Sequence, residues 1–369
     1  MKTYYWRLRN FATSLVKSPR PKIRGDVRWS VAATVKEPMM VLLPFVCHHL
    51  EMGADEIILY FDDPEDPSIG QIGAIDGVRA VICDDPYWAK RKGRPNGQNE
   101  RQKFNLQDAL ARTSSHWVVH IDADEFLWSS SSVTEDIRRL KMHHDWMAFL
   151  PAERVWDGTY SQGTYDGVFR TPLPDDDPLI VQVYGQDAPW LPSGLSGYRN
   201  YKPAIPHRTG FQPRIHHLTD FGKTDPRPYT SAATSRVLHF EALTRDKWAL
   251  KLLRYAASRR VLEVTGPRWR FIQHVVAQED ILGALYEAFD RAYVLGPEQV
   301  TALEERDALI RPELDLKAAV ARRAPGIEMD WNSKTLDAQI RPALDAVLAE
   351  VDRLRDHILS LDHADGIPT

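Results

Sequence analysis

The residues best suited to chemistry follow the apolar run at positions 117–121, which ends abruptly in Asp122, Asp124 and Glu125. In a β-strand, side chains two positions apart share a face, so Asp122 and Asp124 are expected to point the same way from the strand's end. Paired carboxylate oxygens are the ligands that hard divalent cations prefer. The pattern therefore predicts a cation site, and the alternative is an acidic turn that caps the next helix.

A second Asp-x-Asp occurs at positions 175–177, and its surroundings separate it from the first. It lies between Pro174 and Pro178 in a turn-rich stretch, which is typical of a solvated loop. The first one ends a buried strand, where unpaired carboxylates would be costly. Ligands of open α/β sheets bind at strand ends, so the chemistry is expected at Asp122 and Asp124.

The elements that must position these carboxylates alternate along the first half of the chain. Apolar, valine-rich runs predict strands, longer apolar runs predict helices, and Gly53 is placed to end the first helix. This alternation predicts parallel strands with crossover helices. The expected strands are 27–35, 56–61, 78–83, 116–121 and 147–150, and the expected helices are 39–52, 100–112 and a helix from a Ser132-x-x-Glu135 capping box to about Met142.

The second half of the chain has a different residue pattern. Residues 152–236 are rich in proline, glycine and aromatic residues and predict a long irregular segment, for which substrate contact is favoured over a plain connection. Helices are expected at 245–264, 279–293 and 297–322. Apolar residues from Leu336 to Leu361 then step by threes and fours like a heptad seam, for which packing on the domain is favoured over a coiled-coil dimer.

Composition excludes several classes of protein. With 369 residues and 43% apolar content the chain can bury a large core, and a formal net charge of -4 gives no reason to expect nucleic-acid binding. The two cysteines, Cys47 and Cys83, suit reduced thiols rather than a disulfide framework. No apolar run approaches the roughly 20 residues that span a bilayer, so a cytoplasmic protein is expected.

The first 25 residues form a basic amphipathic segment. An apolar helical face with flanking lysine and arginine residues suits the surface of an anionic membrane. The alternative is a helix packed on the body with a basic tail. Peripheral contact with the inner face of the membrane is therefore one of two interpretations of residues 1–25.

A co-linear set of motifs runs through residues 30–255. It consists of Lys36 with His48-His49-Leu50, residues 53–60, the acidic turn 62–67, Gln102 with Asn105-Leu106 and Ala109-Leu110, residues 117–127, and, more weakly, Lys202, Ile205, His207, His216-His217-Leu218, Leu238-His239-Phe240 and Lys247. Together these motifs resemble the bacterial GT-A-type glycosyltransferases related to glycosyltransferase family 2, the branch with an Asp-x-Asp-Glu-Phe strand end. The chain departs from that pattern at Glu37-Pro38, where an Asn-Glu pair is usual, and at Pro44, where an acidic residue is usual.

The resemblance implies a GT-A-like, Rossmann-like mixed α/β sheet with flanking helices. It also implies an N-terminal segment 1–25, a glycosyltransferase domain 26–255 and a helical C-terminal extension 256–369. The implied activity is metal-dependent transfer of a sugar from a nucleotide-diphosphate donor, with a UDP-sugar favoured, to a saccharide or glycolipid, in cell-surface polysaccharide assembly and with inversion.

Site residues follow from the resemblance position by position. Asp122 and Asp124, completed by His239, would hold Mn²⁺ or Mg²⁺ against the diphosphate, while a core or helix-capping histidine is the alternative for His239. Asp62 or Asp63 would bind the nucleobase or ribose, and the alternative is a turn that is simply solvated. Lys202 would pair with phosphate oxygens, unless it is a surface lysine.

The acceptor side and the general base rest on chemistry as well. An inverting transfer needs a carboxylate to take the acceptor's proton. Glu125, Glu153, Asp157 and Glu241 are eligible; Glu125 on a strand would face away from the metal pair, so Glu153 and Asp157 are the predicted catalytic residues. Trp190 and Tyr198, in an aromatic, glycine-rich run, are predicted to stack on sugar faces, with His216 and His217 beside them.

Two other functions fit parts of the pattern. A nucleotidyltransferase also uses acidic metal sites, but its glycine-rich phosphate loop after the first strand is missing at residues 35–38. A non-catalytic sugar-binding scaffold on the same fold is the third possibility, because fold alone does not decide function. The intact Asp122 and Asp124 favour the transferase.

Overall fold

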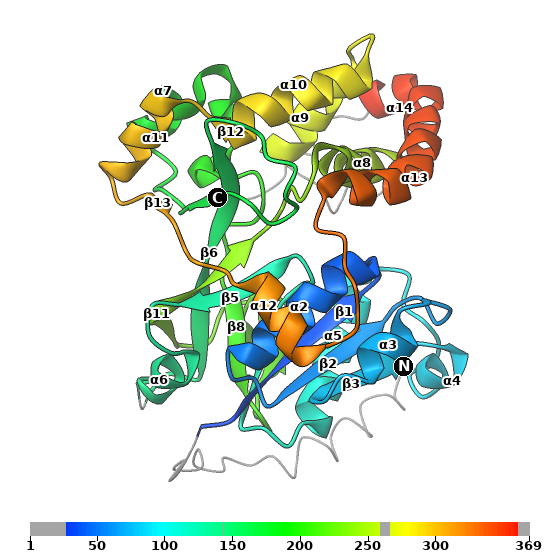
Figure 1. Cartoon of the computed structure of the whole chain (residues 1–369), viewed down its shortest axis with the longest axis vertical. Helices are drawn as coiled ribbons and strands as arrows, with labels where there is room; N and C mark the ends of the chain where they lie inside the picture. The colour runs from blue at the N-terminus through cyan, green and yellow to red at the C-terminus, as the bar shows by residue number, and fades with distance from the viewer. Residues whose placement is uncertain (1–26, 142, 259–265, 361–369) are drawn as a thin grey trace. The chain divides into compact units, whose positions relative to one another are not determined.

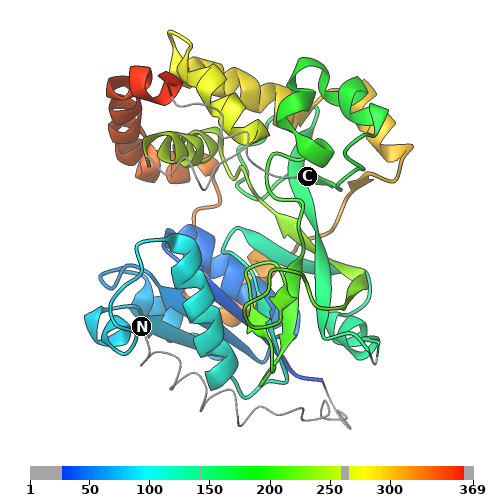
Figure 2. The same ribbon diagram turned by 180° about the vertical axis from the view of Figure 1, so that it is seen from behind.

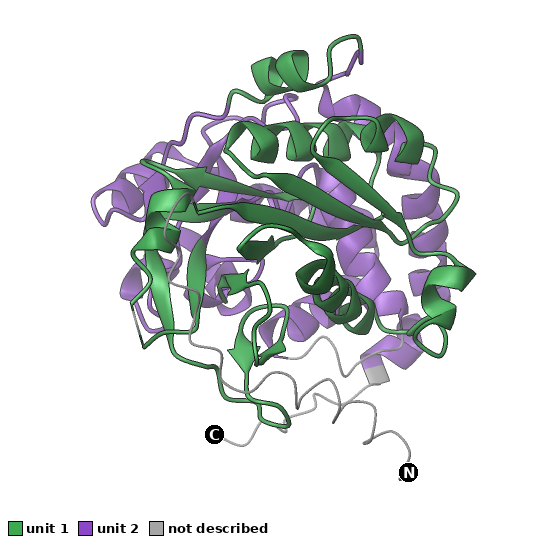
Figure 3. Ribbon diagram, turned by 90° about the horizontal axis from the view of Figure 1, so that it is seen from below, with its two compact units in different colours: residues 1–150, 200–237, 315–326 green, residues 151–199, 238–314, 327–369 purple. Residues whose placement is uncertain are grey.

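The computed structural model describes residues 27–141, 143–258 and 266–360. The chain divides into two compact units, each made of separated segments (Figure 3). The first unit comprises residues 1–150, 200–237 and 315–326, and the second comprises 151–199, 238–314 and 327–369. The division at residues 25 and 255 expected from the sequence is of another kind and stays a prediction.

The first unit is an α/β sheet whose parallel strands are the ones expected from the sequence (Figure 1). Its elements are β1 (Trp29–Val35), α2 (Met39–Glu51), β2 (Glu56–Phe61), α3 (Ile69–Gly73), β3 (Val78–Ile82), α4 (Asp85–Ala89), α5 (Gln98–Arg112), β4 (Trp117–His120), β5 (Glu125–Ser129), α6 (Val133–Arg138), β8 (Lys202–Pro206), β9 (Gln212–Pro213), β10 (Leu218–Thr219) and α12 (Leu316–Arg323).

Strand order in this unit is β6-β8-β4-β1-β2-β3. Strands β1 to β4 run parallel, and β8 runs antiparallel to both β4 and β6. In the described residues the strands form one mixed sheet of 11 strands and a separate β9–β10 pair. The mixed α/β fold expected from the sequence is therefore confirmed.

Helices cover both faces of the first unit's sheet, and strands β1, β2 and β4 are therefore buried on both sides. Opposite views show α2 and α12 on one face and α5 on the other (Figure 1, Figure 2). Leu106 and Ala109 of α5 pack with Ala32, Ile58 and Val118 of three strands. Helix α2 is buried from Met40 to Leu50 and ends before Gly53, whose φ of 91° suits only glycine well.

Two long strands, β6 (Trp146–Asp157) and β11 (Tyr229–His239), continue from the first unit into the second. The other elements of the second unit are β7 (Val168–Arg170), α7 (Pro178–Tyr184), the 3-10 helices η1 (Gly185–Trp190) and η2 (Pro192–Gly194), α8 (Arg245–Ala257), α9 (Pro267–Val276), α10 (Ile281–Tyr293), β12 (Val294–Leu295), α11 (Pro297–Glu304), β13 (Leu309–Ile310), α13 (Ser333–Arg353) and α14 (Arg355–Ser360).

Three expectations about elements are wrong. The predicted irregular segment contains β7, β8, α7 and parts of β6 and β11. The helix expected at 297–322 is two helices, α11 and α12, separated by β13. The chain turns after α11 at Asp307, whose φ of 52° is not helical. The predicted capping box does not form, because the Ser132 side chain makes no capping hydrogen bond and Glu135 pairs with Arg138 instead. The helix ends at Arg138 and not near Met142.

The heptad-like seam packs within its own unit, as favoured from the sequence. Leu336, Leu344, Val351 and Ile358 are buried, and α13 contacts α8 while α14 contacts α9. This packing uses the apolar face that a coiled-coil dimer would need. An oligomer through the C-terminal helix therefore finds no support.

The start of α13 carries a pH-sensitive carboxyl group. Burial raises the pKa of Asp337 to about 6; Asp246 also raises it, whereas Thr244 and Arg341 oppose the rise. A carboxyl whose folded pKa is raised costs no stability below its unfolded pKa near 4 and costs most above its folded pKa.

We therefore expect Asp337→Asn to stabilise the protein by about 1–2 kcal/mol at pH 7–8 and by almost nothing at pH 4. Melting temperatures of both proteins between pH 4 and pH 8 check this. A difference that stays constant with pH contradicts it.

Candidate active site

The acidic residues after β4 lie in a tight turn rather than on a continuing strand. Strand β4 ends at His120 and β5 begins at Glu125, so Asp122 and Asp124 belong to the turn that joins the two strands. The expectation that they share a strand face is therefore wrong, because the chain reverses between them. The turn still lies at the carboxyl end of β4, the edge at which α/β proteins bind ligands.

Asp122 is held from both sides. Gln102 Nε2 donates to its Oδ1 at 2.7 Å and Lys202 Nζ donates to its Oδ2 at 2.7 Å. Burial is the largest influence on the pKa of Asp122 and would raise it, but the charge and hydrogen bond of Lys202, together with His120, outweigh burial and lower the pKa. Asp122 is therefore a charged, oriented carboxylate.

Lys202 is a buried lysine, so its sequence-based alternative as a surface residue is wrong. It is the first residue of β8, and it lies near the turn because β8 runs antiparallel to β4. Its side chain is 1% exposed, and its Nζ contacts Glu125 Oε2 at 3.0 Å as well as Asp122. Burial opposes its charge, yet the two carboxylates raise its pKa.

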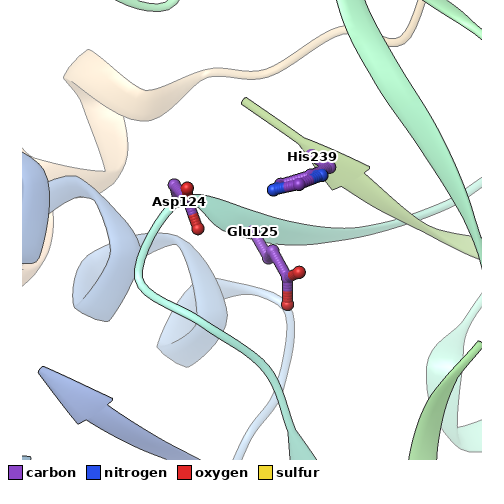
Figure 4. Close-up of side chains that lie close together, drawn as sticks. All are labelled: Asp124, Glu125 and His239. Atoms are coloured by element: carbon purple, nitrogen blue, oxygen red, sulfur yellow. The ribbon is translucent and has the colours of Figure 1, made fainter. Parts of the chain in front are cut away.

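Glu125 faces the turn, contrary to expectation. Its Oε2 accepts a hydrogen bond from the backbone N–H of Asp122 at 2.8 Å. Asp124, half-buried beside it, offers a carboxylate oxygen within 4.8 Å of one of Glu125 (Figure 4). The period-two rule missed Glu125 because the turn, which the sequence did not reveal, resets the direction of the side chains.

A second acidic turn follows β2 at the same edge. Asp62 pairs with Arg94 at 2.8 Å and with Arg101 at 2.9 Å. Asp63 is more exposed; the backbone N–H of Glu65 and the ammonium of Lys36 lower its pKa. The two predicted nucleotide-binding residues therefore differ, since Asp62 is already bound by two guanidinium groups.

Helix α5 links the two turns through consecutive residues. Arg101 binds Asp62 and Gln102 binds Asp122. One turn further on, Asn105 donates to Thr34 Oγ1 at 2.8 Å and accepts from the hydroxyl of Tyr87 at 2.7 Å. The first turns of α5 therefore fix the distance between the acidic groups at the sheet edge.

The predicted acceptor histidines lie in the first unit. His216 Nδ1 contacts the Tyr201 carbonyl at 3.0 Å, and burial, with a contribution from Lys202, lowers its pKa to about 4. Burial also lowers the pKa of the more exposed His217. Both are neutral at physiological pH and can accept or donate one hydrogen bond through each ring nitrogen.

The predicted catalytic residue Glu153 lies in the second unit, where donors surround it. Arg170 pairs with it at 2.5 Å, both side chains being 1% exposed. The backbone N–H groups of Ser196 and Gly197 donate to its two oxygens at 3.0 and 2.5 Å. A carboxylate so enclosed is poorly placed to take a proton from an acceptor.

Asp157, the other predicted catalytic residue, is exposed and pairs with Arg311. Asp175 and Asp177 of the second Asp-x-Asp also have structural partners: Asp175 binds Ser193, and Asp177 caps α7 and pairs with Arg306. Asp176 between them is exposed. Asp175 and Asp176 are thus solvent-exposed, as predicted for this loop, whereas Asp177 is buried.

His239 ends β11 (Figure 4). Within the second unit its Nε2 lies 3.2 Å from Glu241 Oε2, and the ring of Tyr198 lies against it with centroids 4.9 Å apart. Burial alone would raise the pKa of Glu241, but Lys251 and Arg268 outweigh it and lower the pKa. Tyr198 is thus a packing partner of His239.

Trp190 lines a hollow in the second unit. Its ring stacks on His274 with centroids 6.1 Å apart. Trp248, Phe271, Ser196 and Arg268 line the same hollow. An aromatic wall beside polar groups is the kind of surface that contacts a sugar ring, so contact of Trp190 with the acceptor stays a prediction.

The predicted amphipathic segment 1–25 lies outside the described residues. Among the residues that are described, no helix is long and apolar enough to cross a bilayer.

Comparisons with known proteins give matches in structure but not in sequence. No protein-family model matches the chain, and no curated protein matches it in sequence. Similar solved structures include S. aureus TarS 1-349, at 8% identity and a TM-score of 0.29, with 90% of each chain covered. The same fragment in complex with UDP gives 9% identity, a TM-score of 0.25 and 90% coverage of each chain.

A longer S. aureus TarS structure matches at 10% identity and a TM-score of 0.26, covering 90% of this chain and 55% of the other. At this level of similarity, function must be inferred from the side chains of the chain itself. Its fold and acidic edge define an α/β protein with a candidate ligand site beyond β2 and β4.

Proposed function

We propose that the protein is a metal-dependent glycosyltransferase that moves a sugar from a nucleotide-diphosphate donor to a saccharide or glycolipid. The observation that carries this proposal is the acidic edge of the first unit, where the turns after β2 and β4 are joined by Arg101 and Gln102. Carboxylates alone would repel a diphosphate. A cation held between the carboxylates and the diphosphate would make the same edge a binding site for the nucleotide-sugar donor.

The donor set fits Mn²⁺ or Mg²⁺, because Asp124 and Glu125 offer adjacent carboxylate oxygens. Such a cation would neutralise the charge that develops on the departing diphosphate. Asp122, whose two oxygens already bind Gln102 and Lys202, is proposed to share in the site mainly by orienting the turn. Asp63 and Asp62 are proposed to receive the ribose or nucleobase.

His239 is proposed as a further ligand of the cation, as the resemblance of the sequence to the glycosyltransferases implies. Its imidazole would add one nitrogen to a site made mainly of carboxylate oxygens, which are the ligands that Mn²⁺ and Mg²⁺ prefer.

The finer parts of the proposal concern donor, acceptor and outcome. UDP-sugars are the first donors to test, and Trp190, Tyr198, His216 and His217 are the proposed acceptor contacts. Inversion and a place in cell-surface polysaccharide assembly are part of the same proposal. A nucleotidyltransferase fits less well, since Lys36-Glu37-Pro38 after β1 offers no glycine-rich phosphate loop.

Calorimetric titration of a panel of uridine and guanosine diphosphate sugars tests the function. We expect binding with Mn²⁺ present and at least a tenfold weaker affinity with excess chelator, because the uncompensated carboxylates then face the diphosphate. Affinity that survives chelation contradicts the metal dependence. Binding of free sugars but of no nucleotide sugar indicates the non-catalytic scaffold.

A further inference from the structure

The buried ammonium of Lys202 contacts two of the three carboxylates of the acidic turn. Its Nζ lies 2.7 Å from Asp122 and 3.0 Å from Glu125, so the ammonium group forms charge-assisted hydrogen bonds to both carboxylates and lies between them as a bound cation would. It is 1% exposed, so a substrate phosphate could reach it only after these carboxylates had moved. The earlier prediction that Lys202 binds phosphate therefore fits the geometry poorly.

The charges of the turn give this lysine a specific role. Asp122, Asp124 and Glu125 together carry three negative charges, and Lys202 cancels one of them, which leaves two. One divalent cation then brings the turn to neutrality. Without the lysine, a turn holding one divalent cation would keep a net negative charge and would repel an incoming diphosphate.

We propose that Lys202 is a positioning residue that acts as a fixed internal cation: it orients Asp122 and Glu125 and sets the charge at which a single divalent cation can present a nucleoside diphosphate. This inference rests on the proposed function and deepens it. It assigns Lys202 to the carboxylates rather than to the donor. Lys202 therefore lowers the affinity for the metal alone and raises the affinity for the nucleotide on the metal.

Lys202→Met tests this inference, with two affinities measured by calorimetry on the full chain. Mn²⁺ alone is expected to bind about tenfold or more tightly to the variant than to the wild type, because a third carboxylate charge is uncovered. UDP at saturating Mn²⁺ is expected to bind about tenfold or more weakly. Lys202→Arg keeps the charge and should restore most of the UDP affinity.

The matched control is Lys223→Met, which removes an exposed lysine paired with Asp220 and should change neither affinity. A merely structural role for Lys202 predicts that the two affinities move together or not at all, and either result overturns the proposal. If Lys202→Met does not fold, Lys202→Gln keeps hydrogen-bond donors at the buried position but removes the charge. It should show the same two shifts, with Mn²⁺ bound more tightly and UDP more weakly, and affinities equal to those of the wild type overturn the idea.

The outcomes also separate this inference from the proposed function. If the wild type binds no Mn²⁺ while Lys202→Met does, the lysine occupies the place of the metal: the internal cation is supported and the metal dependence of the function is wrong. If Mn²⁺ binds equally to both proteins, the function stands and the role of Lys202 is wrong.

Discussion

Asp124→Asn is expected to reduce sugar transfer by about a thousandfold or more, while the melting temperature of the metal-free protein stays equal or rises slightly. Asp124 follows Asp122 by two residues and lies beside Glu125, so its charge adds to a crowded acidic turn. Removing one of these charges relieves repulsion when no cation is bound. The same change removes a ligand when one is.

The loss of activity and the gain in stability must be measured on the same preparation. Release of nucleoside diphosphate from the donor that binds best reports turnover, and thermal melting with and without Mn²⁺ reports the cation. We expect Mn²⁺ to raise the melting temperature of the wild type but not that of the variant. Transfer at the wild-type rate by Asp124→Asn would rule out the metal-bridged mechanism.

Asp176→Asn is the matched control. It is the same substitution in the other Asp-x-Asp, at an exposed position between two aspartates that have structural partners. Neither turnover nor the response to Mn²⁺ should change. A similar loss there would mean that the effect of Asp124→Asn is one of overall charge.

The parallel half of the fold was predictable because its inner strands β1, β2 and β4 are buried on both faces and form continuous apolar runs in the sequence. The boundaries of β1, β2 and α2 follow directly from Val27 to Phe61. The antiparallel half was not predictable, because proline and polar residues interrupt the apolar pattern of β8 and β11. The register of β8 is set by its pairing with β4 and β6, which lie far away in the sequence. Sequence patterns within a short window do not contain that information.

The candidate site divides in the same way. Asp122 and Asp124 were selected from the sequence because they follow an apolar strand, and their role in a metal site stays a prediction. Glu125 was misplaced because the turn was taken for a strand, and Lys202 was misjudged because its burial depends on a strand 80 residues away pairing with β4. The positions of acidic residues after an apolar strand are therefore easier to predict than the burial of a lysine that contacts them.

Glu153→Ala is expected to lower the free energy of unfolding by about 3–5 kcal/mol and the melting temperature by roughly 10 °C. The change leaves the buried guanidinium of Arg170 without its carboxylate and the N–H groups of Ser196 and Gly197 without their acceptor. Thermal and denaturant unfolding at pH 7 measure the loss.

Two further variants separate this structural role from the predicted catalytic one. Replacing both partners by apolar residues, as in Glu153→Leu with Arg170→Met, should recover much of the lost stability. A buried charge that has lost its partner costs more free energy than the replacement of both charges by apolar side chains. Asp157→Asn, which breaks only an exposed pair with Arg311, should cost less than about 1 kcal/mol. A loss of turnover in Asp157→Asn at unchanged stability would support it as the general base.

The opposite result for Glu153 is equally informative. If Glu153→Gln keeps the melting temperature of the wild type and loses turnover, the carboxylate is needed for its charge at the reaction and not for the fold, and Glu153 is the base after all. The contacts with Arg170, Ser196 and Gly197 predict instead that Glu153→Gln lowers the melting temperature, and that any loss of turnover is a consequence of the lower stability.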